Sequence, residues 1–165
     1  GPAPGFFDYQ LNTSNAGSGF DAASNEEKLD ALIAIAKKPE VDTEDYAGEV
    51  MVMDTTSHSF MSNPRANTDT SIAQYLMNNT TVRAILKTSY LDSVTSAVNS
   101  FSDDRIVSVF PRSAEVMEFM LPRDTQFFPV QVRGVHYFVP VLIDMAGLFM
   151  YIYGSGGPVV AAPMS

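Results

Sequence analysis

The stretch QFFPVQVRGVHYFVPVLI, residues 126–143, decides how the fold is interpreted. It holds two apolar runs, 126–132 and 135–143, joined by Arg133-Gly134, and a third run follows at residues 148–153 after Met145-Ala146-Gly147. Two strands separated by two residues that include a glycine are typical of a tight β-hairpin. The last third of the chain is therefore predicted to form a three-stranded antiparallel meander.

Two prolines interrupt this stretch. Pro129 and Pro140 have no backbone N–H to donate to a sheet, so they favour edge positions or bulges.

The residues before the meander predict short helices mixed with strands. We expect a helix from a cap at Ser24 to a stop at Pro39, a strand over residues 49–53, a short helix capped by Asp54 or Thr55 and a turn over residues 63–67. We then expect a helix capped by Asp69 or Thr70, a strand over 81–87, a serine-rich loop over 89–104, a strand over 105–110 and a short helix over 113–120. This order predicts an α+β fold, in which short helices flank a mixed sheet.

The chain is predicted to contain one domain. Residues 24–165 form a single α+β domain in this interpretation, and residues 1–23, rich in Gly, Ser, Asn and Pro, form an irregular N-terminal arm or linker. The arm contains Phe6, Phe7 and Phe20, so we expect it to pack on something. Gly1-Pro2 is typical of the scar left by a tag-cleaving protease, so two interpretations stay open, an excised fragment of a longer natural chain and a shorter protein that begins at Ala3.

Composition excludes several classes of function. The 165 residues include no cysteine, which removes disulfides, thiolate zinc sites and cysteine nucleophiles. A formal net charge of −9, without a cluster of Lys and Arg, argues against nucleic acid as a main partner. The most apolar segment, residues 135–153, is interrupted by His136, Pro140 and Asp144, so a membrane-spanning segment is not expected either.

The serine in Gly154-Ser155-Gly156-Gly157-Pro158 is the candidate nucleophile, because a similar Gly-Gly-Pro follows the serine of chymotrypsin-like proteases. A serine nucleophile needs a base within hydrogen-bond reach, and the two histidines are poor partners. His58 begins a polar helix and His136 alternates with apolar residues in a strand. We therefore predict no catalytic residue and interpret residues 154–158 as a flexible insertion that adjusts the chain or contacts another subunit.

Metal and cofactor sites are not predicted either. Residues 42–45 lack the spaced ligands and glycine of a calcium loop and are interpreted as part of a solvated acidic connector over 40–45. Asp103-Asp104 is interpreted as the beginning of a strand. Asp144, inside an apolar run, is expected at a bend, at the rim of the sheet or paired with Arg133.

The order of several motifs resembles the C-terminal portion of phage major capsid proteins of the Hong Kong 97-like family, in particular prophage-encoded subunits. The motifs are residues 50–53 before a short helix, the helix start at 69–76, Asp104-Arg105-Ile106-Val107, residues 111–118, Phe127-Phe128-Pro129-Val130-Gln131, residues 134–140 and residues 146–149. Two departures are that Ala146-Gly147 replaces a double glycine and that a terminal proline is delayed to Pro158.

The resemblance implies a structural role. The segment would correspond to the axial domain, a sheet flanked by helices at the centre of pentamers and hexamers, with part of the peripheral domain. An N-terminal arm and an extended loop would lie upstream. The partners would be copies of the same chain, meeting through loops and sheet edges, with no small-molecule substrate, cofactor or membrane. The protein would be made in the host bacterial cytoplasm and reside in the virion capsid.

Two alternatives remain at this point. The first is a phage or bacterial binding or decoration module, whose aromatic residues contact a host glycan or protein; these residues are Phe6, Phe7, Tyr9, Tyr151 and Tyr153. The second is a serine hydrolase that uses Ser155.

Overall fold

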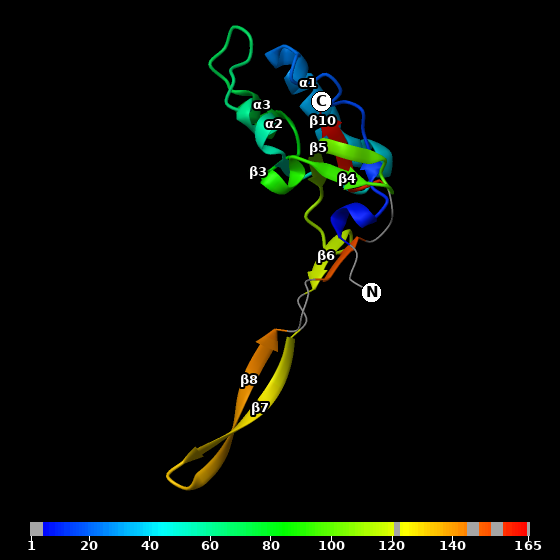
Figure 1. Cartoon of the computed structure of the whole chain (residues 1–165). Coiled ribbons are helices and arrows are strands. Elements are labelled where there is room, and N and C mark those ends of the chain that lie inside the picture. Colours follow the sequence, from blue (N-terminus) through cyan, green and yellow to red (C-terminus); the bar gives the residue numbers. More distant parts are fainter. Residues whose placement is uncertain (1–4, 121–122, 145–148, 153–156, 165) are drawn as a thin grey trace.

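The structure, a computed structural model, describes residues 5–120, 123–144, 149–152 and 157–164 (Figure 1). Its helices are η1 (Phe6–Asp8), α1 (Asn25–Thr43), α2 (Thr55–Ser59), α3 (Ile72–Asn79) and η2 (Ser89–Leu91), of which η1 and η2 are 3-10 helices. Its strands are β1 (Asn12–Thr13), β2 (Val50–Met53), β3 (Ala84–Lys87), β4 (Val94–Ser96), β5 (Phe101–Phe110), β6 (Met117–Met120), β7 (Arg123–Val132), β8 (Val135–Asp144), β9 (Phe149–Ile152) and β10 (Val160–Met164). The fold is mixed α+β, as the sequence predicts.

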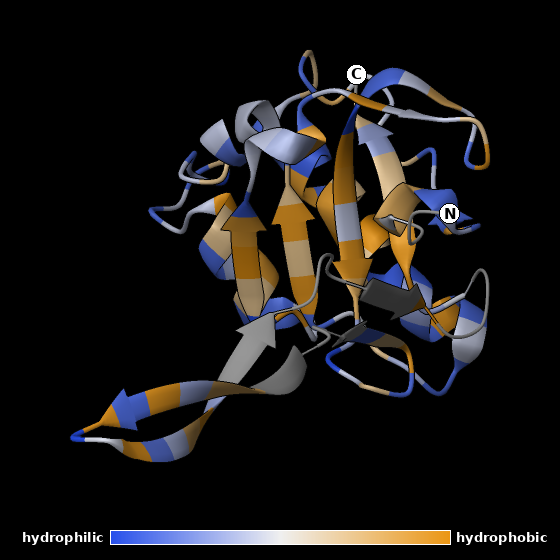
Figure 2. Ribbon diagram, turned by 60° about the horizontal axis from the view of Figure 1, so that its bottom comes forward, coloured by the Kyte–Doolittle hydropathy of each residue, from blue (hydrophilic) through white to orange (hydrophobic). Residues whose placement is uncertain are grey.

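The centre of the fold is a mixed sheet with the strand order β1-β10-β5-β2-β3, and β4 also pairs with β5. Strands β10 and β2 run antiparallel to β5, whereas β1 and β3 lie parallel to their neighbours. Figure 2 shows the apolar strands side by side. Side chains alternate between the two faces, so each face has its own core. Met51 and Val109 join a cluster with α1 and α3, and Ile106 and Ala161 join a second cluster on the other face.

Helix α1 begins where the sequence predicts but ends later. The Oγ of Ser24 accepts a hydrogen bond from the Glu27 N–H at 3.2 Å, which confirms the predicted cap. The predicted stop at Pro39 is wrong, because the helix continues to Thr43 and Glu44 then ends it with a left-handed φ of 60°. Pro39 lies within the helix and is buried. Proline has no N–H and therefore costs the helix one hydrogen bond, but burial of its apolar ring offsets this cost. Residues 40–43 of the predicted connector are therefore helical.

Three other local predictions are corrected by the structure. Helix α3 is capped by Ser71, whose Oγ accepts from the Gln74 N–H, and not by Asp69 or Thr70. The predicted loop over residues 89–104 contains η2, β4 and the first residues of β5. Residues 117–120, predicted as part of a helix, form strand β6 because they pair with β9 far along the chain.

The predicted three-stranded meander is also wrong in one respect. Strands β7 and β8 pair with each other, but β9 pairs with β6 instead of β8. The residues of the expected second turn, 145–147, lie outside the described residues. The result is a separate two-stranded ribbon, which Figure 1 shows extending away from the central sheet.

The N-terminal segment is attached to the body through Asn99, which is 5% exposed. The Asn99 Oδ1 accepts from the Leu11 N–H at 2.8 Å, and its Nδ2 donates to the carbonyl oxygens of Phe7 at 3.1 Å and Tyr9 at 3.0 Å. Phe6 and Phe7 pack against the second core cluster, and Phe20 is buried in the first. One side chain therefore holds three successive backbone groups of the segment on the sheet.

Replacement of Asn99 with alanine is expected to destabilise the protein by about 2–4 kcal/mol, because the buried Leu11 N–H loses its acceptor and the Tyr9 carbonyl oxygen loses a donor. The Phe7 carbonyl oxygen also loses a hydrogen bond but still accepts from the Ser96 Oγ at 2.7 Å. Urea unfolding followed by circular dichroism measures this loss. The matched control is Asn79→Ala. Asn79 is exposed, and its side-chain Nδ2 donates a hydrogen bond to the Tyr75 carbonyl oxygen within α3. Its loss is expected to cost less than about 0.5 kcal/mol. Equal effects of the two substitutions would contradict the proposed anchoring.

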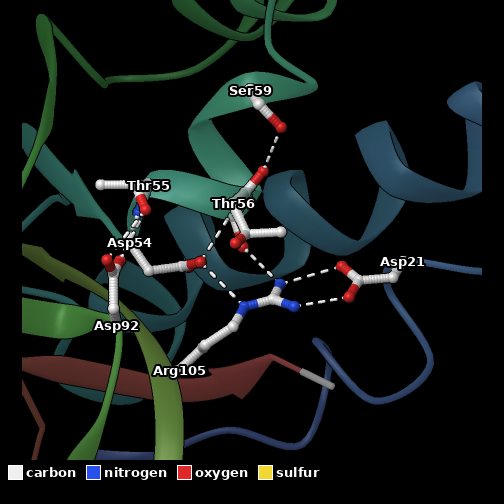
Figure 3. Close-up of polar contacts among 8 residues, drawn as sticks. Asp21, Asp54, Thr55, Thr56, Ser59, Asp92 and Arg105 are labelled. Atoms are coloured by element: carbon white, nitrogen blue, oxygen red, sulfur yellow. Dashed lines mark hydrogen bonds and ion pairs between the residues drawn. The ribbon is translucent and has the colours of Figure 1, made fainter. Parts of the chain in front are cut away.

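An ion cluster that is buried at Asp54 and exposed at Asp21 connects β5 to α2 and to the N-terminal segment (Figure 3). The Arg105 Nε donates to the Asp54 Oδ2 at 2.8 Å, and its terminal nitrogens donate to both carboxylate oxygens of Asp21 and to the Ser57 Oγ. The Asp54 Oδ2 also accepts from the Ser57 N–H at 3.0 Å, so Asp54 caps α2, as the sequence predicts. Each of these side chains bonds to another residue of the protein, so the cluster stabilises the fold.

Candidate assembly surface

The ribbon of β7 and β8 is the most unusual surface of the described chain. Its register runs from Arg123 opposite Asp144 to Val132 opposite Val135. Arg133 and Gly134 connect the strands with positive φ angles of 51° and 79°. Two consecutive residues with positive φ make a type I′ turn, which matches the twist of the flanking strands. This confirms the tight turn that the sequence predicts at Arg133-Gly134.

One face of the ribbon carries only apolar side chains over its outer half. Cross-strand partners lie on the same face, so this face, which we call the continuous apolar face, consists of the pairs Phe128–Val139, Val130–Tyr137 and Val132–Val135. All six side chains are between 41% and 53% exposed. An exposed face of this composition resembles the inner layer of a protein and not its surface.

The opposite face, which we call the aromatic face, contains the pairs Phe127–Pro140, Pro129–Phe138 and Gln131–His136. Phe127 and Phe138 are diagonal neighbours on it and are 64% and 71% exposed. Polar side chains appear on this face next to the turn. Both faces of the ribbon therefore present large apolar groups to solvent.

One proline in each strand weakens the edges of the ribbon as places where another strand could be added. In a hairpin with a two-residue turn the flanking pair, Val132–Val135, is hydrogen-bonded, and the pairs then alternate. Pro129 and Pro140 fall in the non-hydrogen-bonded pairs, where an N–H would point outward from the edge. Each edge thus lacks one outward donor, which discourages addition of another strand.

A two-stranded ribbon with both faces in water is marginal on its own. Exposed apolar patches of about 300–600 Å² are often functional, and larger ones mark interaction sites. The exposed apolar faces of the ribbon are therefore the candidate functional site of this chain.

Of the three residues considered for a serine nucleophile and its base, the structure describes the two histidines and places them in separate elements. Ser155 lies outside the described residues. His58 lies in α2, whereas His136 lies in β8 opposite Gln131 and is exposed. Figure 1 shows these two elements in different parts of the molecule.

The acidic candidates occupy structural positions. Asp42 accepts from the Asn12 Nδ2 at 2.7 Å and pairs with the Lys38 Nζ at 3.1 Å, and both contacts lower the pKa of its carboxyl. Asp103 lies within β5 and accepts from the Ser93 Oγ. The suggested pairing of Asp144 with Arg133 is wrong, because the register places Arg123 opposite Asp144 and puts Arg133 at the other end of the ribbon.

Among the described residues, no group of three or more His, Asp or Glu side chains is placed to hold a metal ion. Likewise, none of the helices in the described ranges has the length and apolar character needed to cross a bilayer. The aromatic residues of the binding-module alternative are less available than expected, since Phe6, Phe7 and Tyr9 are half-buried against the second core cluster. The side chains of Tyr151 and Tyr153 lie outside the described residues.

The sequence predicted the two strands of the ribbon but not the exposure of their side chains to solvent. The signal was present, because Phe127 and Phe128 are adjacent and therefore point to opposite faces, as do Tyr137 and Phe138. A strand that is apolar on both faces needs cover on both faces.

Comparison with known proteins identifies the fold. No protein family model matches the sequence, and no curated protein matches it either. The structure is similar to a chain of the capsid of Myoviridae phage XM1, with a TM-score of 0.69 and 17% sequence identity over 98% of this chain and 53% of that one. It is also similar to the virus-like particle from Pyrococcus furiosus, with a TM-score of 0.59 and 12% identity over 93% of this chain and 56% of that one.

The fold is therefore one found in the chains of capsids and virus-like particles. The chain spans about half the length of each of these two proteins.

Proposed function

We propose that this chain is a structural subunit, or a piece of one, of a phage capsid-like shell that assembles from copies of itself. The single observation that carries the proposal is the ribbon of β7 and β8, whose continuous apolar face is exposed on a fold found in capsids. A shell subunit needs such surfaces because each copy must bury apolar area against its neighbours.

The proposal includes the finer assignments suggested by the sequence. The family is the Hong Kong 97-like one and the subunit is of the prophage type, with rings of five and six copies. Residues 24–165 form one domain, with residues 1–23 as its arm. The protein is not an enzyme, it is made in the host cytoplasm and it resides in the virion. The motif order at residues 104–118 and 127–140 supports this assignment.

The size of the ribbon predicts how strongly copies associate. A stable interface usually buries about 20–30 residues on each partner, and the continuous apolar face consists of six side chains. We therefore expect the 165-residue chain to associate weakly and reversibly, and shells to form when many such contacts act together.

Sedimentation velocity over a range of concentrations, with negative-stain electron microscopy, tests the proposal. The 165-residue chain is expected to show a concentration-dependent increase in sedimentation coefficient. The natural reading frame that contains it is expected to yield closed shells or rings. A natural-length chain that stays monomeric under all assembly conditions would refute the proposed function.

A further inference from the structure

The residues before α1 lie along one edge of the central sheet, and we call residues 5–23 the strap. Its strand β1 lies next to β10, where the Asn12 N–H donates to the Val159 carbonyl oxygen at 2.9 Å. The Ser14 N–H donates to the Ala161 carbonyl oxygen at 3.0 Å. Among the described strands, β1 is the outermost on this side of the sheet. The strap can therefore leave without separating any other pair of described strands.

The strap is attached less firmly than the strand that it covers. Strand β10 pairs with β5 from Val160 to Met164, whereas β1 pairs with β10 only at Asn12 and Thr13. The buried residues of the strap are Leu11, Gly17 and Phe20. A segment at the edge of a sheet with few buried side chains opens at a lower free energy than the core of the same protein.

Arg105 holds one end of the strap and keeps its partners in the body when the strap leaves. Its terminal nitrogens bind the Asp21 carboxylate, as Figure 3 shows. It also donates to the Asp54 Oδ2 at 2.8 Å and to the Ser57 Oγ at 3.0 Å. Asp54 is 0% exposed, whereas the Asp21 side chain is 42% exposed. Opening therefore gives Asp21 to water and leaves the buried carboxylate of Asp54 paired, which avoids the large cost of an unpaired buried charge.

Asn99 has the same arrangement near the other end of the strap. Besides its bonds to the strap, its Nδ2 donates to the Ser96 Oγ at 3.1 Å, and its backbone N–H donates to the same oxygen at 3.2 Å. The two polar side chains that hold the strap, Asn99 and Arg105, thus each keep a hydrogen-bond partner within the body. The strap groups that they release can bind water instead, which reduces the cost of opening.

The strap has a hinge at its last residue. Lys28 of α1 is 4% exposed, and its Nζ donates to the Ala23 carbonyl oxygen at 2.6 Å. Ala23 directly precedes the Ser24 cap and is therefore held on α1. Opening also takes Leu11 and Phe20 out of the two core clusters, so the closed state dominates and the open state is a minor population.

We propose that the strap opens and closes on the body as one unit, with its hinge at Ala23, while α1 and the rest of the central sheet stay folded. This inference concerns the chain itself and goes beyond the proposed function. In the open state the carbonyl oxygens of Val159 and Ala161 lose their donors, and β10 becomes an edge of the sheet. The strap is thus a device that covers and uncovers β10, and an uncovered edge strand is a place where another strand can pair.

Native-state hydrogen exchange followed by NMR tests the opening in the 165-residue chain. The reporters are the backbone N–H groups of Leu11, Asn12 and Ser14, which donate to Asn99, Val159 and Ala161. We expect the three to share one protection factor, at least about tenfold below that of the amides at the centre of β5. Their opening should also depend less on urea, because it exposes less surface than complete unfolding.

Replacement of Asp21 with alanine tests whether the strap moves as one unit. The substitution removes the contact with Arg105 and leaves Asp54 paired, and Asp21 is exposed, so the variant folds. Exchange at Leu11, Asn12 and Ser14 should accelerate by one common factor of about three to ten, although the bonds of these groups lie elsewhere. The matched control is Asp69→Ala, an exposed aspartate outside the strap, which should leave the three rates unchanged.

Each outcome supports or overturns the inference. Equal acceleration of the three reporters, from a protection below that of β5, supports it. Protection equal to that of β5 overturns it, because the strap would then open only when the whole protein unfolds. Unprotected reporters overturn it because the strap would not close. Acceleration of fewer than all three, or equal acceleration by Asp69→Ala, also overturns it. The shell proposal is tested separately by sedimentation and does not depend on these results.

Discussion

Replacement of both Val130 and Tyr137 with threonine is expected to weaken self-association about a hundredfold. These residues form the central pair of the continuous apolar face and are 41% and 53% exposed. Loss of a buried aromatic anchor from an interface commonly costs about 2–4 kcal/mol, and each 1.4 kcal/mol is about tenfold in affinity. Threonine is β-branched and suits a strand, so the ribbon itself is preserved. Sedimentation equilibrium measures the change.

The body of the protein is expected to keep its stability in this variant. Neither side chain belongs to the two core clusters, so the urea midpoint monitored by far-UV circular dichroism should stay within experimental scatter. The matched control is Val98→Thr, an exposed valine outside the ribbon at 46% exposure, which should leave association unchanged. If Val98→Thr weakens association as much as the ribbon variant does, the ribbon is not the assembly surface.

Local signals predicted the elements whose ends depend on neighbouring residues. Ser24 and Asp54 cap α1 and α2 because their side-chain oxygens lie three residues from the N–H groups that they accept from. The Arg133-Gly134 turn follows in the same way from the backbone preferences of its own two residues.

The elements that depend on distant partners could not be predicted in this way. Residues 117–120 have a helical pattern, yet they form a strand because β9, about thirty positions later, pairs with them. Pro39 normally ends a helix, but burial of its ring in the core lets α1 continue.

The sequence predicted the two strands of the candidate site but did not predict that their faces are exposed. The alternation at Phe127–Phe128 and Tyr137–Phe138 indicates two strands, but the same alternation fits a strand buried between two layers. Only the three-dimensional arrangement shows that both faces are exposed on the described chain.

The second large effect concerns the buried ion cluster. Replacement of Arg105 with methionine is expected to destabilise the protein by about 3–5 kcal/mol, because it leaves the carboxylate of Asp54 buried without its cationic partner. Asp54 is 0% exposed, and its Oδ1 has no hydrogen-bond partner among the described residues even in the native protein. This loss is a large fraction of the roughly 5–15 kcal/mol that stabilises a typical domain. Urea unfolding at neutral pH measures it.

A double variant separates the buried charge from loss of packing. Asp54→Asn in the Arg105→Met background removes the unpaired charge but keeps an oxygen that accepts from the Ser57 N–H, so part of the lost stability should return. A double variant no more stable than Arg105→Met would show that packing, and not charge, explains the cost.

The acid dependence of stability provides an independent test of the same cluster. The hydrogen bonds from Arg105 hold the pKa of the Asp21 carboxyl below its ordinary value. A lowered pKa in the folded state means that Asp21 contributes stability above its unfolded pKa, and that this contribution is lost as the pH falls through the folded pKa. The wild-type protein should therefore lose stability over that acidic range, whereas Arg105→Met should lack the Asp21 part of the loss. An unchanged acid dependence in Arg105→Met would contradict a stabilising pair, because Asp21 would then titrate alike with and without its guanidinium partner.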